Sequence, residues 1–282
     1  MTPDEYCKQK AASSGSSFYY SFLFLPPEKK CAIISLYAFC REVDDIVDEN
    51  LNADIALDKL NGWRDEIDRL FHANPQTQVG KALAQTVERF NLAAEYFHEI
   101  IDGMEMDLNK QTYRNFSELS LYCYRVASVV GLLAAEIFGY TDRNTLKYAN
   151  DLGMAFQLTN ILRDVKEDAE RGRIYLPLDE MDEYGITGDM LSGNHTTPSM
   201  QNLFRLQAER ARSYYDSALQ HLPETDRYSQ RSGIMMAAIY RKLLDKIETG
   251  GYRVLEKRVR LPAWQKLWLA WHVYRNEKQI IN

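Results

Sequence analysis

Apolar residues recur every three or four positions along most of the chain, which is the spacing of one face of an α-helix. This pattern predicts helices over residues 28–48, 55–71, 119–138, 145–168, 201–222 and 232–248. Because no proline occurs from Gln76 to Leu176, we expect another long helix from about Val79, with breaks at Gly103, Gly139 and Thr141–Asp142. No segment has the character of a β-strand, so the expected fold class is all-α.

A charged stripe crosses the first of these helices. Helical spacing places Tyr37, Arg41, Asp44, Asp45 and Asp48 on one face. The neighbouring positions are apolar and leave little other polar surface. A charged stripe on a buried helix needs partners or a metal ion.

The helix over 145–168 repeats this arrangement, with Gln157, Asn160, Asp164 and Asp168 on one stripe and Arg163 beside it. Aspartates four residues apart on a helix have Cβ atoms about 5–6 Å apart and repel each other unless a cation lies between them. Mg2+ takes one or two carboxylates and completes its shell with water and substrate phosphates. Two such faces opposite each other would hold a diphosphate through several Mg2+ ions, whereas a single pair is more often a solvated acidic face.

Three other segments have two interpretations each. The hydroxyls of Ser13–Ser17 can bind phosphate or cap a helix, and Arg171 and Arg173 can close over a diphosphate or cap the helix before them. The small residues Ala127, Ser128 and Gly131 allow close approach of another helix or of a ligand chain. The acidic residues of 103–107 are expected at an exposed helix end.

Composition excludes several classes of protein. The 282 residues carry a net charge of −6, which argues against a general nucleic-acid surface. No run of 18 or more apolar residues occurs and residues 1–10 lack the apolar core of a signal peptide, so we expect a cytoplasmic protein without a membrane span. The four cysteines form no C-x-x-C pair, which predicts reduced thiols and no zinc site.

Near the C-terminus, Trp264, Leu267, Trp268 and Trp271 follow a basic run with helical spacing. A tryptophan stripe beside Lys and Arg can dock on a membrane surface, which would make the protein peripheral at the inner face of the membrane. Of the two interpretations, packing of the stripe onto the helix bundle is the one that we expect.

Several of these segments resemble the squalene/phytoene synthases in order and spacing over nearly the whole chain. They are Ser17–Pro26, Leu36–Asp45, Tyr122–Tyr124, Gln157–Asp168 and Arg171–Pro177. Within the family, Ser16–Pro27 and Arg41–Asp45 are most similar to bacterial presqualene diphosphate synthases of hopanoid and squalene synthesis. Family members often carry a basic residue before Phe18, where this chain has only Ser13–Ser16.

The resemblance implies one domain over residues 1–282, an isoprenoid-synthase helical bundle around a central cavity. It implies metal binding by Asp44, Asp48, Asn160, Asp164 and Asp168. It further implies that side chains contact diphosphate or the reacting carbons, namely Ser17, Phe18, Tyr37, Arg41, Tyr122, Gln157, Arg163, Arg171 and Tyr240. Of these, Phe18, Tyr37, Arg41 and Tyr122 are the catalytic candidates.

The expected reaction is the head-to-head condensation of two farnesyl diphosphates to presqualene diphosphate. Mg2+ is the expected ion, Mn2+ could replace it, and NADPH is not expected to take part. Contacts with downstream enzymes of the squalene pathway are compatible with this role. The alternatives are a phytoene synthase, a full NADPH-dependent squalene synthase, an inactive assembly protein of the same fold, and a structural metal-binding bundle. The assembly relatives typically lose acidic motif residues, which this chain retains, and a structural cation site would not need Arg41, Arg163 and Arg171 beside the carboxylates.

Overall fold

The computed structural model describes residues 1–13, 18–49, 52–109 and 112–277. Over these residues the chain is helical, and its one β-type pairing is an isolated parallel bridge between Thr112 and Ile174. The all-α prediction is therefore confirmed. The elements are α1 (Pro3–Ser13), α2 (Phe18–Phe22), α3 (Pro27–Glu49), α4 (Ala53–Phe71), α5 (Gln78–Phe90), α6 (Ala94–Asn109), α7 (Phe116–Cys123), the π-helical turn η1 (Tyr124–Ser128), α8 (Val129–Phe138), α9 (Asn144–Glu170), α10 (Leu178–Glu183), α11 (Gly188–Leu191), α12 (Pro198–His221), the 3-10 turn η2 (Glu224–Asp226), α13 (Arg231–Thr249) and α14 (Ala263–Asn276).

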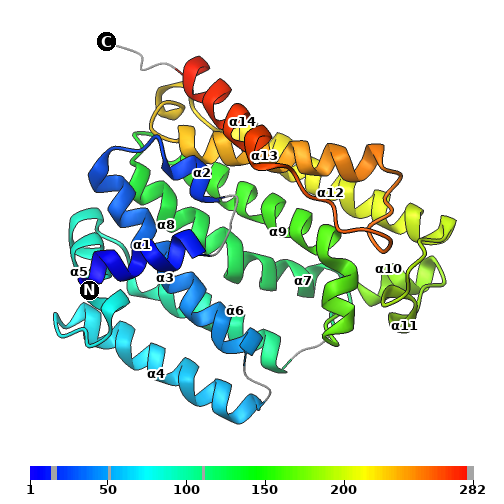
Figure 1. Ribbon diagram of the computed structural model, residues 1–282, viewed down its shortest axis with the longest axis horizontal. Coiled ribbons are helices and arrows are strands. Elements are labelled where there is room, and N and C mark those ends of the chain that lie inside the picture. The colour runs from blue at the N-terminus through cyan, green and yellow to red at the C-terminus, as the bar shows by residue number, and fades with distance from the viewer. Residues whose placement is uncertain (14–17, 50–51, 110–111, 278–282) are drawn as a thin grey trace.

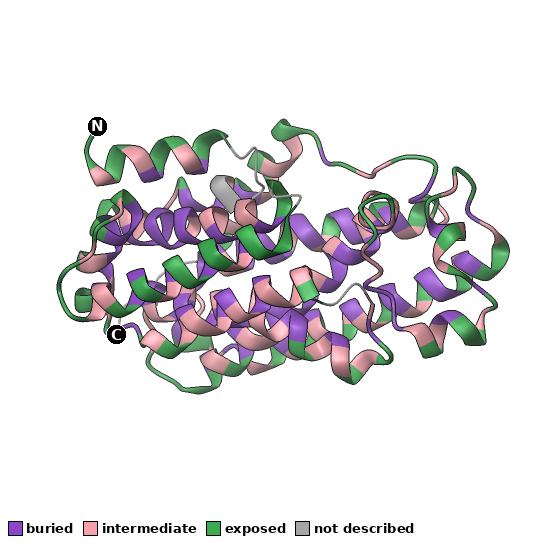
Figure 2. Ribbon diagram, turned by 90° about the horizontal axis from the view of Figure 1, so that it is seen from below, coloured by how far each residue is buried: buried purple, intermediate pink, exposed green. Residues whose placement is uncertain are grey.

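Helix α9 runs through the middle of the bundle, between α8 and α12 (Figure 1). Two apolar cores fill the bundle, and α9 contributes to one of them. One joins α1, α3, α4, α5 and α6, and the other joins α7, α9, α12 and α13. Buried residues concentrate on the inward sides of the helices (Figure 2). Helix α3 belongs to the first core and α9 to the second, so their polar stripes lie where the two cores adjoin.

Glycines allow α9 to pack against η1 and α8 at backbone distance. A Cβ atom on Gly153 would lie 2.5 Å from the Ser128 Cα, and one on Gly131 would lie 2.6 Å from the Ala149 carbonyl oxygen. The Ser128 hydroxyl donates a hydrogen bond of 2.8 Å to the Asn150 carbonyl. Of the two interpretations of these small residues, close helix packing is the one that the structure supports.

The predicted break at Gly103 is wrong. Helix α6 continues through Gly103 to Asn109, and the chain turns earlier, after Phe90, where Asn91 is left-handed with a φ of 49°. Gly103 is required for packing, since a Cβ there would lie 2.7 Å from the Val126 Cγ1. The breaks at Gly139 and Thr141–Asp142 are confirmed, because α8 ends at Phe138 and α9 begins at Asn144.

Within the described part of the chain, the continuous helix Phe116–Phe138 is long and apolar enough to cross a membrane by length and composition. The sequence criterion of an uninterrupted apolar run did not detect it. Half of its most apolar window is buried, and the helix packs against α6 and α9. Its contacts are those of a core helix.

Candidate active site

A cavity of about 840 Å³ lies between α3 and α9. Every predicted site residue whose side chain the structure describes lines this cavity: Tyr37, Arg41, Asp44, Asp48, Tyr122, Gln157, Asn160, Arg163, Asp164, Asp168, Arg171 and Tyr240. Ser17 and the side chain of Phe18 lie outside the described part of the structure. Residues separated by more than 200 positions in the sequence thus share one site, although their individual roles stay predictions.

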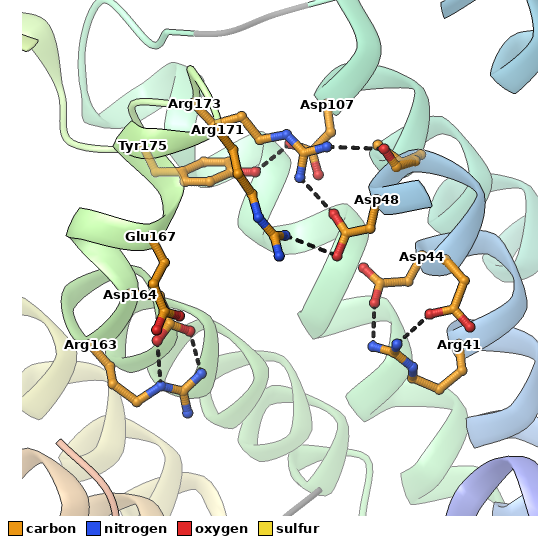
Figure 3. A network of polar contacts seen from close by, with 12 residues as sticks. Arg41, Asp44, Asp48, Asp107, Arg163, Asp164, Glu167, Arg171, Arg173 and Tyr175 are labelled. Carbon is orange, nitrogen blue, oxygen red and sulfur yellow. Dashed lines mark hydrogen bonds and ion pairs between the residues drawn. The ribbon is translucent and has the colours of Figure 1, made fainter. Parts of the chain in front are cut away.

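On the α3 side of the cavity, Arg41 is the centre of the acidic stripe. Its guanidinium donates to Asp44 Oδ2 at 2.5 Å and also to Asp45. Asp45 additionally pairs with Lys10 of α1, at 3.0 Å. Asp45 is therefore bound into the N-terminal helices, whereas Asp44 and Asp48 face α9 (Figure 3).

On the α9 side, Asp164 is held by two arginines. Arg163 Nε donates to Asp164 Oδ1 at 2.8 Å, and Arg258 Nε donates to the same oxygen at 2.9 Å. Arg258 also pairs with Glu167 at 2.9 Å. The segment after α13 thereby reaches back across the cavity to the second acidic stripe.

The loop after α9 connects the two sides. Arg173 donates to Asp48 Oδ1 at 2.9 Å and Arg171 to Asp48 Oδ2 at 3.2 Å (Figure 3). Both arginines contact a carboxylate on another helix, so closing over the cavity is the better description than capping α9. The Arg171 side chain remains 59% exposed and is free to reorient toward a ligand.

Carboxylates in the cavity are incompletely neutralised. Burial, with the nearby charges of Asp48 and Asp45, raises the pKa of Asp44 to about 6. Burial, with the charges of Asp164 and Asp107, raises the pKa of Asp168 to about 7. These carboxylates lie in a site that favours an added cation.

The donor groups suit a hard divalent ion. Asn160 Oδ1 is buried without a hydrogen-bond partner, which costs about 1–3 kcal/mol unless something else occupies it. It lies on the same helix stripe as Asp164 and Asp168, and all three supply oxygen, as Mg2+ requires. In the described residues no three His, Cys, Asp or Glu side chains already converge as a ready metal cluster. The residues therefore fit a metal ion that takes some of its oxygen ligands from the protein and the others from a bound substrate.

Asp107 is a site residue that sequence reasoning missed. The expectation of an exposed helix end for residues 103–107 is wrong, because α6 carries Asp107 to the cavity wall. It accepts hydrogen bonds from Tyr122 at 2.9 Å and from Tyr175 at 2.7 Å. Burial raises the pKa of Asp107 to about 6 and holds the pKa of Tyr122 well above its usual range. On a helix that continues past Gly103, Asp107 lies on the same face as residues 103 and 104. This spacing was the signal in the sequence that could have placed Asp107 at the cavity.

The segment after α13 also lines the cavity, through Arg258, Val259, Arg260, Leu261 and Lys266. The basic run was visible in the sequence, but no periodicity connected it to the acidic helices. Its position depends on tertiary contacts such as Lys246 Nζ to the Arg260 carbonyl, at 2.8 Å.

These helices, enclosing a cavity with acidic stripes on opposite sides, have the all-α fold of the isoprenoid synthases. The squalene/phytoene synthase family model matches residues 11–265. The chain belongs to the squalene/phytoene synthase family, whose members are prenyltransferases that use divalent metal ions to bind diphosphate.

Curated relatives include the phytoene synthase of Arthrospira platensis, which is 36% identical over an alignment of 280 positions that covers 93% of this chain and 89% of the relative. Phytoene synthase 1 of Arabidopsis thaliana is 36% identical over 267 residues, and the chain spans 63% of its length.

Two solved structures are similar over most of their length. A dehydrosqualene synthase in complex with a ligand superposes with a TM-score of 0.87 at 26% identity, over 97% of this chain and 96% of the other. The squalene synthase HpnC from Alicyclobacillus acidocaldarius superposes with a TM-score of 0.80 at 28% identity, over 89% of this chain and 94% of the other.

The four cysteines are free, as predicted.

Proposed function

We propose that the protein condenses two farnesyl diphosphates head to head to presqualene diphosphate, in the cytoplasm and with Mg2+. The observation that carries this proposal is the pair of acidic stripes on α3 and α9, which face each other with arginines across one cavity of about 840 Å³. A structural cation site would not need those arginines. A diphosphate site needs carboxylates to hold the metal ions and arginines to bind the phosphate oxygens.

Asp44 and Asp48 on one side, with Asn160, Asp164 and Asp168 on the other, are the residues that would hold the metal ions. When bound, Mg2+ neutralises the diphosphate and makes it a better leaving group. Arg41, Arg163 and Arg171, now paired with carboxylates, would turn to phosphate oxygens when substrate binds. The arginines therefore keep the acidic stripes in place until the ligand arrives.

The chemistry requires a cavity wall that tolerates a carbocation. Loss of diphosphate from the donor leaves an allylic cation, which the C2–C3 double bond of the second substrate attacks. Aromatic faces such as those of Tyr37, Tyr122 and Tyr240 stabilise positive charge, and exclusion of water prevents premature quenching.

Closure of the cyclopropane releases one proton. Tyr122 can accept it on its oxygen while its own hydroxyl proton passes to Asp107, 2.9 Å away. The raised pKa of Asp107, about 6, suits a carboxylate that holds a proton transiently. The released diphosphate is the competing proton acceptor.

Phytoene synthesis from two C20 diphosphates is the second candidate. It is favoured by the curated relatives that are 34–36% identical and are named phytoene synthases. The two candidates share the metal and diphosphate residues and differ in the length of the tail that the cavity accepts.

A product assay separates these candidates. The purified protein and Mg2+ are supplied with C15 or C20 prenyl diphosphate, with and without NADPH, and the products are identified by mass spectrometry. We expect presqualene diphosphate from the C15 substrate, irrespective of NADPH, and none from the Asp44→Asn variant.

Other outcomes would replace the proposal with a specific alternative. Squalene that appears only with NADPH identifies a full squalene synthase, and a product from the C20 substrate alone identifies a phytoene synthase. No product from either substrate would reject the synthase function and favour an assembly protein of this fold.

A further inference from the structure

The outer face of α14 exposes a stripe of large apolar residues. Trp264 is 71% exposed, Trp268 53% and Trp271 47%, so three of the four tryptophans in the chain face solvent. Leu267 and Tyr274 extend this α14 stripe, with the spacing of a single helix face. The opposite face, with buried Ala270, packs on α13 at an edge of the molecule (Figure 1). The expectation that the tryptophans pack onto the bundle is wrong.

The surroundings of the α14 stripe are basic. Residues 252–276 contain six Lys or Arg residues and a single acidic residue, Glu256, in a chain with a net charge of −6. Helix α14 itself contains no Asp or Glu. The Arg275 guanidinium lies 5.2 Å from the centre of the Trp271 ring, at the margin of the stripe. Arg258, Arg260 and Lys266 line the cavity, whereas Arg253, Lys257 and Arg275 are exposed and remain available to an anionic surface.

This combination favours a lipid surface over a protein partner. Trp and Tyr flanked by Lys and Arg are typical of helices that lie in the headgroup region of a bilayer. A second copy of the chain would place the same basic residues opposite each other across a twofold axis, where they repel. An anionic bilayer instead matches both the apolar stripe and its basic margin.

We propose that α14 docks the protein on a membrane that contains anionic phospholipids, with the α14 stripe inserted at the boundary between headgroups and acyl chains. The same helix turns Lys266 toward the cavity, and Val259 and Leu261 before it also line the cavity wall. The docked face therefore adjoins the cavity. If the proposed function is correct, this position gives the apolar hydrocarbon part of the product, presqualene diphosphate, a short route into the bilayer.

Flotation with lipid vesicles tests the docking directly. The full chain is mixed with vesicles of phosphatidylcholine alone or of phosphatidylcholine with phosphatidylglycerol. A Trp268→Glu/Trp271→Glu variant is compared with Ile55→Glu, which changes an equally exposed apolar residue on α4 at the opposite edge of the molecule (Figure 1). We expect binding to the anionic vesicles that weakens with salt, is retained by Ile55→Glu, and falls at least about tenfold in the double variant.

Tryptophan fluorescence supplies an independent readout. Wild-type emission should shift to shorter wavelength on vesicles and be quenched by brominated acyl chains, because the exposed tryptophans enter the bilayer. Absence of vesicle binding, or equal binding by the double variant, would reject the proposal. A dimer that becomes monomeric in the double variant, without lipid binding, would assign the α14 stripe to self-association instead. Condensation activity on dispersed substrate measures the proposed function separately, so the two failures are distinguishable.

Discussion

At the scale of single residues, the site contains polar groups that the fold alone does not require. Asn160 has a buried carbonyl oxygen without a partner, and Asp107 is a shielded carboxylate that accepts from two tyrosines. Each carries a cost in stability that a purely structural residue would not be expected to keep. Function and stability should therefore respond in opposite directions when these residues are changed.

Replacing Asn160 by leucine should remove activity without destabilising the metal-free protein. The substitution eliminates an unsatisfied buried oxygen, so the free energy of unfolding should stay within about 1 kcal/mol of the wild type or rise. Activity should fall at least about 100-fold, because a metal ligand is lost. Urea unfolding with a chelator and the product assay measure the two effects.

Thr159→Val is the matched control. Thr159 precedes Asn160 in the sequence, and its hydroxyl is also buried. Unlike the Asn160 oxygen, this hydroxyl has hydrogen-bond partners, since it donates to the Ala155 carbonyl at 2.7 Å and lies 2.9 Å from the Tyr215 hydroxyl. Its loss should destabilise the protein by about 1–3 kcal/mol, because Tyr215 is left without its partner. Equal destabilisation by both substitutions would contradict the assignment of Asn160 as a ligand.

Asp107→Asn should stabilise the protein increasingly as pH rises. The folded-state pKa of about 6 lies above that of an unfolded aspartate, about 3.9, so the folded state binds more protons between these values. The contribution of the Asp107 carboxyl to the free energy of unfolding of the wild type therefore falls as pH rises from about 4 to about 6. The decrease is on the order of 2 kcal/mol, and the variant, which has no carboxyl at this position, does not undergo it.

Unfolding of both proteins in urea at pH 4 and pH 7.5, in chelator, measures this difference. The exposed Asp58→Asn serves as the control for replacing a surface carboxylate by an amide. A stability difference for Asp107→Asn that is independent of pH would show that Asp107 is not protonated more readily in the folded protein.

At the scale of elements, backbone-to-backbone packing fixes the position of α9 and hence of its polar stripe. Gly153 lets α9 approach η1 so closely that a Cβ atom would lie 2.5 Å from a backbone carbon. Neither backbone can move without shifting a long helix. The position of the α9 ligands relative to α3 therefore depends on residues that never contact a substrate.

Gly153→Ala should destabilise the protein by about 1–3 kcal/mol, although alanine has the higher helix propensity. Gly62→Ala is the matched control, because Gly62 lies within α4 and a Cβ there would meet nothing within 4 Å. It should stabilise the protein by up to about 1 kcal/mol. Thermal unfolding of both variants separates the packing effect from propensity, and stabilisation by both would refute the packing argument.

At the scale of the whole molecule, the sequence was sufficient for the fold class and for the members of the site that repeat with helical period. The stripes on α3 and α9 could be recognised in the sequence because each contains two aspartates four residues apart, which are neighbours on a helix. These pairs are Asp44 with Asp48 and Asp164 with Asp168. Asp107 and Arg258 were missed because their places depend on where α6 continues and where an irregular segment folds back. Gly103 was misread because a glycine needed for packing has the same sequence signature as a helix end.

The charge balance of the whole cavity predicts how ligands stabilise the molecule. In the free protein, arginines pair with Asp44, Asp48 and Asp164, so a metal ion alone must compete with them for these carboxylates. Pyrophosphate alone must compete with the carboxylates for the same arginines. Only the two ligands together leave every charge with a partner, because the metal binds the carboxylates and the arginines bind phosphate oxygens.

Mg2+ with pyrophosphate should therefore raise the melting temperature strongly, and either one alone should raise it little. At about 100 times the dissociation constant the gain is about 2.7 kcal/mol, which corresponds to about 5 °C or more for a chain of this size. Differential scanning fluorimetry with each ligand, with both and with chelator measures it, and an Asp44→Asn/Asp164→Asn variant should lose the combined effect. A structural metal site predicts the reverse pattern, in which Mg2+ or Ca2+ alone gives the full stabilisation and pyrophosphate adds nothing. The experiment thus decides between a diphosphate site and a structural cation site without reference to any product.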